Sequence, residues 1–115
     1  MAIIKSYSDL QQSKKLAEIL PLESADMYWW STSLRYYIEA MDDGDFNEEE
    51  GHIRAWSLAA LLKTLNFPSL TQNKEDEWEV CVFDPDNDNY IEKTASNPVD
   101  ACYEMILKLK ELSML

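Results

Sequence analysis

The run DPDNDNYI carries the residues best suited to hold a metal ion in this chain. Asp84, Asp86 and Asp88 offer carboxylate oxygens at alternate positions, as the first half of an EF-hand calcium loop does. The rest of the run differs from an EF-hand loop, because Asn89 stands where such a loop needs glycine and Ala95 stands where it needs a bidentate glutamate. Pro, Asp and Asn are also the residues that close a β-hairpin. The run therefore predicts a turn first and a weak calcium site second.

Other catalytic chemistry lacks the residues that it needs. His52 is the only histidine, and no nucleophile motif accompanies it. Cys81 and Cys102 are the only cysteines and lack Cys-x-x-Cys spacing, so zinc is not expected and both thiols are predicted to be small core residues. With Gly44 and Gly51 as the only glycines, a glycine-rich phosphate loop is excluded. We predict no catalytic residues, no cofactor and no enzymatic activity.

Charge is the strongest global signal in the sequence. The chain has 22 acidic and 10 basic residues, a net charge of −12, and thirteen of the acids fall in Asp42–Glu50, Glu75–Glu79 and Asp84–Asp88. A field of this sign repels the phosphate backbone, which disfavours direct nucleic-acid binding. The simplest interpretation is that acidic loops keep a small domain soluble. The alternative is an acidic surface that occupies a basic, nucleic-acid-binding groove on another protein.

The sequence predicts three helices and one hairpin from the periodicity of its apolar residues. Ser8–Leu20 predicts a helix with a Ser-x-x-Gln capping box at its start, and Trp56–Leu65 predicts a second helix. A third helix begins with Asn97 as its cap and Pro98 at its first position. Between the last two helices, Trp78–Thr94 alternates as two strands around the DPDNDN turn.

Met27–Met41 is ambiguous, because its apolar residues fit both a strand and a helix. Its density of Tyr, Trp, Thr and Ile favours a second hairpin that turns near Ser31–Ser33. The predicted order is α-β-β-α-β-β-α, an α+β fold in which two hairpins form one four-stranded antiparallel sheet with helices packed on it. We expect one domain over residues 1–115. With no signal peptide and no apolar stretch of membrane-spanning length, a cytoplasmic protein is expected.

Aromatic residues in this second hairpin are the candidates for protein binding. Trp29 and Trp30 are adjacent, so in a strand they must point to opposite faces, and one of them could be exposed. An exposed tryptophan with Tyr37 could form a protein-binding or homodimer patch, although helices could instead cover both rings. The following acidic run would complete such a patch with six carboxylates: Asp42, Asp43, Asp45, Glu48, Glu49 and Glu50.

Three sequence blocks resemble a known family: QSKKLAEILPLESADMYW, AWSLAALLKTL and NPVDACYEMILKLKEL. They cover Gln12–Trp29, Ala55–Leu65 and Asn97–Leu112. The family consists of small uncharacterised proteins of gut anaerobic bacteria, their phages and their mobile elements. The resemblance implies an accessory, phage-related origin and an extended conformation after the first block. It implies no activity and no functional residues.

The leading hypothesis for function is a non-enzymatic accessory protein that binds another protein. The narrower alternative is an acidic nucleic-acid mimic that inhibits a DNA- or RNA-binding protein. The third, an enzyme with an unrecognised site, has no supporting motif.

Overall fold

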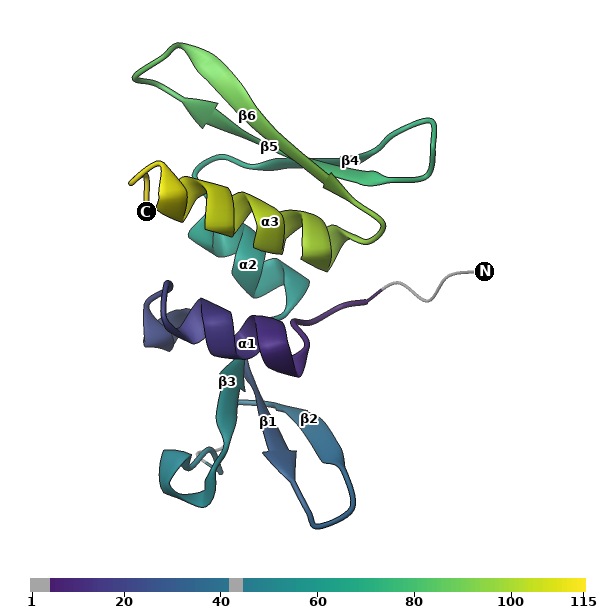
Figure 1. Ribbon diagram of the computed structural model, residues 1–115, viewed down its shortest axis with the longest axis vertical. Helices are drawn as coiled ribbons and strands as arrows, with labels where there is room; N and C mark the ends of the chain where they lie inside the picture. Colours follow the sequence, from purple (N-terminus) through teal and green to yellow (C-terminus); the bar gives the residue numbers. More distant parts are fainter. Residues whose placement is uncertain (1–4, 42–44) are drawn as a thin grey trace.

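The structure, a computed structural model, describes residues 5–41 and 45–115. Three helices form a middle layer, and a three-stranded antiparallel sheet lies at each end of the molecule's long axis (Figure 1). The strand orders are β2-β1-β3 and β4-β5-β6. In chain order the elements are α1 (Leu10–Ala17), the 3-10 turn η1 (Leu22–Ser24), β1 (Met27–Ser31), β2 (Tyr36–Ala40), the 3-10 turn η2 (Glu48–Glu50), β3 (Ile53–Ala55), α2 (Leu58–Thr64), β4 (Ser69–Gln72), β5 (Trp78–Asp84), β6 (Asn89–Ala95) and α3 (Pro98–Glu111).

The α+β class, the order of helices and hairpins, and the hairpin over residues 27–41 are confirmed. The prediction of one four-stranded sheet is wrong, because the two hairpins lie in separate sheets. Each hairpin instead gains a third strand that was not predicted: β3 pairs with β1, and β4 pairs with β5. These strands have three and four residues, too few for alternation to be visible in the sequence.

The β4-β5-β6 sheet and α3 enclose most of the core. Val80 and Val82 on β5 are buried, and α3 covers them with a stripe of buried residues that includes Val99, Cys102 and Ile106. A stripe at intervals of three and four matches the helical period, while the two valines match the strand period of two. Burial of one such side chain stabilises the fold by about 1.5–3 kcal/mol.

Asp100 ties the N-terminal segment and α1 to α3. Its Oδ1 accepts hydrogen bonds from Lys5 Nζ at 2.8 Å and Gln12 Nε2 at 2.7 Å, and its Oδ2 accepts one from Asn97 Nδ2 at 2.7 Å. Burial alone would raise the pKa of Asp100, but these three hydrogen bonds outweigh it and hold the pKa below its ordinary value. The predicted capping box of α1 is shifted by one residue, because Asp9 is the cap that pairs with Gln12.

Trp56 joins the β2-β1-β3 sheet to the helices, in the short connection between β3 and α2. Its side chain is fully buried, and its indole Nε1 donates a hydrogen bond to Ser24 Oγ at 2.9 Å. Its backbone N–H donates to Ser8 Oγ at 3.1 Å, and Ser8 N–H donates back to the Trp56 carbonyl at 2.8 Å. Trp29 Nε1 from β1 donates to the Ser8 carbonyl at 3.2 Å. We refer to Ser8, Ser24, Trp29 and Trp56 as the Trp56 junction.

Replacement of the central side chain should strongly destabilise the protein. Trp56→Ala leaves a cavity in the core and removes one partner of a buried hydrogen bond, so the free energy of unfolding should fall by about 3–5 kcal/mol. Urea denaturation followed by circular dichroism measures this loss. Leu34→Ala is the matched control, because Leu34 is 90% exposed, and it should change the free energy by less than about 0.5 kcal/mol. Equal effects of the two variants would contradict the structure.

Asp100→Asn should alter the acid dependence of stability. A folded-state pKa below the ordinary value stabilises the protein above that value, and the contribution is lost as the pH falls through the folded pKa. At pH 7 the variant should therefore be less stable than the wild type, and the difference should shrink as the pH falls below 3.8. Urea denaturation at several pH values measures it. Asp86→Asn removes an exposed acid of the β5-β6 turn and is the matched control for the change in net charge.

Candidate functional site

A stacked aromatic pair lies across the hairpin β1-β2. Trp30 and Tyr37 are direct cross-strand partners, and their ring centroids are 4.5 Å apart with 19° between the ring planes. The guanidinium carbon of Arg35 lies 4.7 Å from the Tyr37 ring centroid. Both rings are partly exposed. A flat, partly exposed stack of Trp, Tyr and Arg joins the three residue types that most often dominate binding energy at protein interfaces.

Tyr28 lies on the same side of β1, because residues two apart in a strand share a face, but its side chain is buried. Its ring stacks on His52 with centroids 5.1 Å apart, and Phe46 meets it edge-on at 5.7 Å. The Arg54 guanidinium carbon lies 4.5 Å from the Phe46 ring centroid, and Arg54 also forms an ion pair with Glu48. We define the aromatic face as the side of sheet β2-β1-β3 that carries Tyr28, Trp30 and Tyr37.

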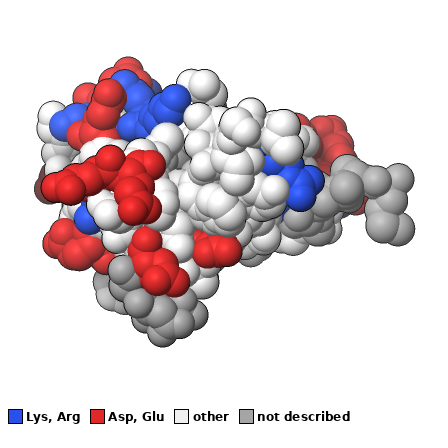
Figure 2. All heavy atoms as spheres, turned by 90° about the horizontal axis from the view of Figure 1, so that it is seen from below, with Lys and Arg blue, Asp and Glu red and all other residues white. Residues whose placement is uncertain are grey.

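Carboxylates border the aromatic face. Asp45 and Glu48–Glu50 are exposed on the loop that carries Phe46 and His52, and Glu39 on β2 accepts a hydrogen bond from Tyr28 Oη at 3.1 Å. Figure 2, which views the molecule from this end, shows most of the visible carboxylates, with basic side chains among them, on one side of an area without charged side chains, and further carboxylates at the opposite edge. The candidates Asp42 and Asp43 lie outside the described residues.

Trp29 does not belong to the aromatic face. Its ring points to the other side of β1, where Tyr7 meets it edge-on at 5.7 Å and its Nε1 donates a hydrogen bond within the Trp56 junction. Of the three aromatic candidates, the structure therefore brings Trp30 and Tyr37 together and assigns Trp29 to packing.

Trp30 carries an unsatisfied donor. Its Nε1 is buried, and in residues 5–41 and 45–115 it is the one buried side-chain nitrogen or oxygen with no hydrogen-bond partner. A buried polar group without a partner costs about 1–3 kcal/mol. The stack of Trp30 and Tyr37 therefore holds hydrogen-bonding capacity that the described chain does not use.

The DPDNDN run forms the β5-β6 turn. The buried Asp84 carboxylate accepts from the Asp86 backbone N–H at 3.0 Å and from Asn87 Nδ2 at 2.7 Å. Asp86 and Asp88 are exposed. Asp84 thus closes the turn with both carboxylate oxygens, as the turn interpretation of the sequence predicts.

Cys81 lies on the outer face of the β4-β5-β6 sheet, so its assignment to the core is wrong, while Cys102 is buried as predicted. The Cys81 Sγ and carboxylate oxygens of Glu79 and Glu92 lie within 4.8 Å of one another, close enough to hold a metal ion together. Burial and a hydrogen bond from the thiol to Glu79 at 3.6 Å raise the pKa of Cys81. The thiol is therefore protonated at neutral pH, the form that does not bind metals.

A cleft with a volume of about 1030 Å³ lies between residues 19–26, α2 and the C-terminal residues. Ile19, Leu20, Ala60 and Met114 contribute apolar surface, and Lys63 is a charged residue of its lining. No ion pair to Lys63 occurs within the part of the chain that the structure describes. The cleft can accept a nonpolar group, and its lining also includes the charged residues Glu23 and Asp26.

Sequence reasoning missed the side chains that complete the aromatic face: Tyr28, Arg35, Phe46, His52 and Arg54. His52, which has no nucleophile motif in the sequence, stacks its side chain on Tyr28. Alternation along β1 pairs Tyr28 with Trp30, so Tyr28 could have been found once a strand was assumed. The loop residues had no such signal.

The two thiols should differ sharply in reactivity. Cys102 is buried, which raises its pKa to about 12, whereas Cys81 is partly exposed. Iodoacetamide should therefore label Cys81 alone in the native protein, slowly at pH 7 and faster as the pH rises, and Cys102 only after unfolding. Peptide mass mapping reads out both sites. Glu79→Gln should speed labelling of Cys81 severalfold, because the carboxylate raises its pKa, and a rate unchanged by this substitution would contradict the hydrogen bond.

No family model, curated protein or solved structure matches this chain. Among the described helices, none is long and apolar enough to cross a membrane. Function is therefore inferred from the chemistry of the chain's own surface.

Proposed function

We propose that this chain is a non-enzymatic accessory protein of phage-related origin that binds another protein through its aromatic face. The observation that carries the proposal is the stacked pair of Trp30 and Tyr37 with the Arg35 guanidinium against it. Such a stack offers a large, rigid contact area at low entropic cost, because aromatic side chains have few rotatable bonds.

The charge around the aromatic face selects a basic partner. Residues 27–55 contain seven acids and two arginines, and Arg54 is already paired with Glu48. A basic segment would be attracted to this end of the molecule, and such attraction mainly increases the rate and the specificity of association. It also predicts that binding weakens as the salt concentration rises.

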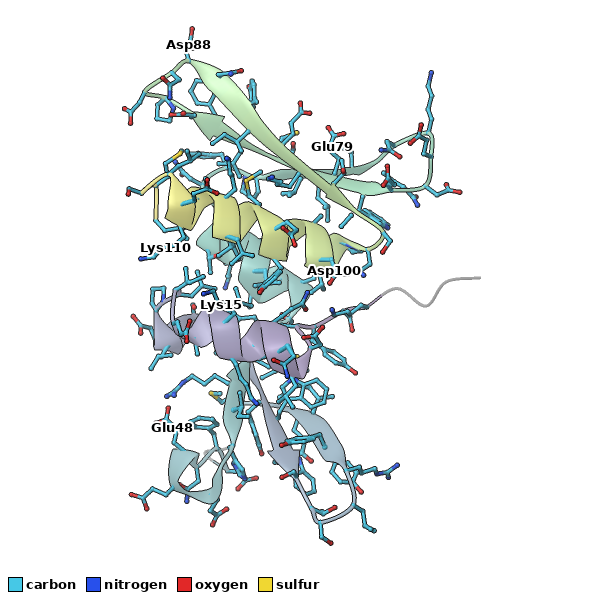
Figure 3. All side chains as sticks on the ribbon, in the orientation of Figure 1. Lys15, Glu48, Glu79, Asp88, Asp100 and Lys110 are labelled. Carbon is cyan, nitrogen blue, oxygen red and sulfur yellow. The ribbon has the colours of Figure 1, made fainter. Side chains whose placement is uncertain are left out.

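The distribution of acids favours this proposal over mimicry of nucleic acid. Glu48 lies at one end of the molecule, whereas Glu79 and Asp88 lie at the other, with the helices between them (Figure 3). The three acidic stretches therefore do not form one continuous line of charge. A phosphate-like surface would have to come from Asp42–Glu50 alone, of which the structure describes residues 45–50.

An enzymatic function has weaker support. Shifted pKa values often mark catalytic groups, but here the clearest shifts have structural causes. The pKa of Asp100 is lowered by bonds that tie α1 to α3, and the pKa of Cys102 is raised by burial in the core.

Tyr37→Ala should abolish capture of the specific partner. The variant removes the outer ring of the stack while leaving the backbone bonds of β2 in place. Tyr90→Ala is the matched control, because Tyr90 also pairs with an aromatic ring, that of Phe83, on the opposite sheet. Immobilised wild type and both variants are incubated with cell lysate at low salt, and bound proteins are quantified by mass spectrometry. A basic protein retained by the wild type and by Tyr90→Ala, and lost with Tyr37→Ala, is the expected result.

A second variant separates loss of binding from loss of structure. Arg35→Ala keeps both rings and removes the guanidinium, so it should weaken capture while near-ultraviolet circular dichroism stays unchanged. Identical sets of proteins on all four baits would contradict the proposal. Competition with duplex DNA separates the mimic from the general binder: displacement by DNA would favour mimicry.

A further inference from the structure

Within residues 5–41 and 45–115, the outer edge of β2 has unpaired backbone groups. Among these residues, β2 pairs with β1 alone (Figure 1). Thr32 N–H donates to the Arg35 carbonyl at 3.0 Å and Met41 N–H donates to the Asp26 carbonyl at 2.9 Å, so odd-numbered residues of this strand face β1. The alternate residues direct their N–H and C=O groups away from the sheet: Tyr36, Ile38 and Ala40.

This edge lacks the usual protection against strand pairing. Proteins shield free edges with charged side chains, prolines or bulges. The β6 edge strand carries two adjacent charges, Glu92 and Lys93, whereas β2 carries one, Glu39, and the three residues whose backbone groups point outward are uncharged. The β2 edge is therefore open to a strand from another chain.

We propose that a second copy of this chain pairs with this edge, β2 against β2, in antiparallel orientation. A two-fold axis perpendicular to the sheet relates the copies and keeps the two aromatic faces on the same side. The residues whose N–H and C=O groups point outward must then lie opposite the outward residues of the second copy, so that these groups can bond to one another. The register centred on Ile38 pairs all three, with Ile38 opposite Ile38 and Tyr36 opposite Ala40 of the second copy. The result is a continuous six-stranded sheet. Registers centred on Tyr36 or Ala40 would leave outward groups unpaired.

The side chains are complementary in this register. On the aromatic face, Glu39 lies opposite Tyr37 of the second copy, so no like charges oppose each other directly. Arg35 lies diagonal to Glu39 of the second copy, within reach of its long side chain, and the two-fold axis repeats this pair. The dimer thus gains two Arg–Glu pairs and places the two aromatic faces side by side.

Net charge opposes the dimer at long range. Each copy carries a charge of −12, and salt screens repulsion between two such molecules. The dimer should therefore tighten as salt rises, whereas binding of a basic partner should weaken. The pairing needs no partner protein, so measurements on the purified chain alone test it separately from the proposed function.

Sedimentation velocity of the full chain tests the proposal. The protein concentration should span about 5 to 500 µM, because interfaces this small bind weakly. The NaCl concentration should be about 50 and 500 mM, because salt screens charge. The dimer fraction should rise with protein concentration and severalfold with salt. Ala40→Pro should abolish it, because it removes an outward N–H without breaking a bond to β1. Thr94→Pro is the matched control, at an exposed position of the other long edge strand, β6, and should leave the dimer intact.

A charge exchange provides the second readout. Arg35→Glu should weaken the dimer at least tenfold, since it places two carboxylates on each diagonal, and adding Glu39→Arg should restore it. A monomer at every concentration and salt would overturn the proposal. So would a dimer that survives Ala40→Pro, one that is lost in Thr94→Pro, or one that the double charge exchange fails to restore.

Discussion

The burial of Trp56 is the constraint on which the rest of the structure depends. Its side chain fills the core, while its backbone and the Ser8 hydroxyl, N–H and carbonyl bind the N-terminal segment, β1 and the start of α2 to one another. One side of sheet β2-β1-β3 packs against this junction. α1 packs on β3, α2 packs on α3, and α3 packs on β5 and β6, so the principal contacts of the described helices lie elsewhere than on the other side of this sheet. The aromatic face is open for this reason, and the loop with Phe46 and His52 covers it only in part.

Three of the ten cations of the chain have local structural contacts. Lys5 binds Asp100, Arg54 pairs with Glu48 and lies over Phe46, and Arg35 lies over Tyr37. With 22 acids against 10 bases, most carboxylates remain unneutralised by the protein itself. A basic partner therefore meets little internal competition at the acidic border of the aromatic face, and the exposed carboxylates favour solubility until it arrives.

The sequence was sufficient for the parts of the fold that local chemistry determines. Alternation along Trp78–Thr94 predicted a hairpin, and Asn97 followed by Pro98 predicted the start of α3. The third strand of each sheet could not be predicted, because three or four residues show no period and their pairing depends on tertiary contacts. Alternation also left open which face of β5 is buried, so Cys81 was assigned to the core, although Val80 and Val82 take that place.

Because Trp29 and Trp30 are consecutive in the sequence, they were expected on opposite faces of the strand. Only the tertiary structure decides which of the two faces packs against Ser8. The alternative of complete coverage by helices fails for Trp30, whose ring is covered by Tyr37 from the same sheet. His52, Phe46 and the two arginines come from loops and strand ends whose positions depend on the register of β1, β2 and β3. No local pattern encodes that register.

Native-state hydrogen exchange in dilute solution tests most directly whether this sheet is anchored on one side and open on the other. The account predicts that the amides of Ser8 and Trp56 exchange only through global unfolding, because their bonds break only when the Trp56 junction opens. The outward amides of Ile38 and Ala40 should exchange orders of magnitude faster. Fast exchange at Trp56, or strong protection at Ile38 and Ala40 in the monomer, would contradict it.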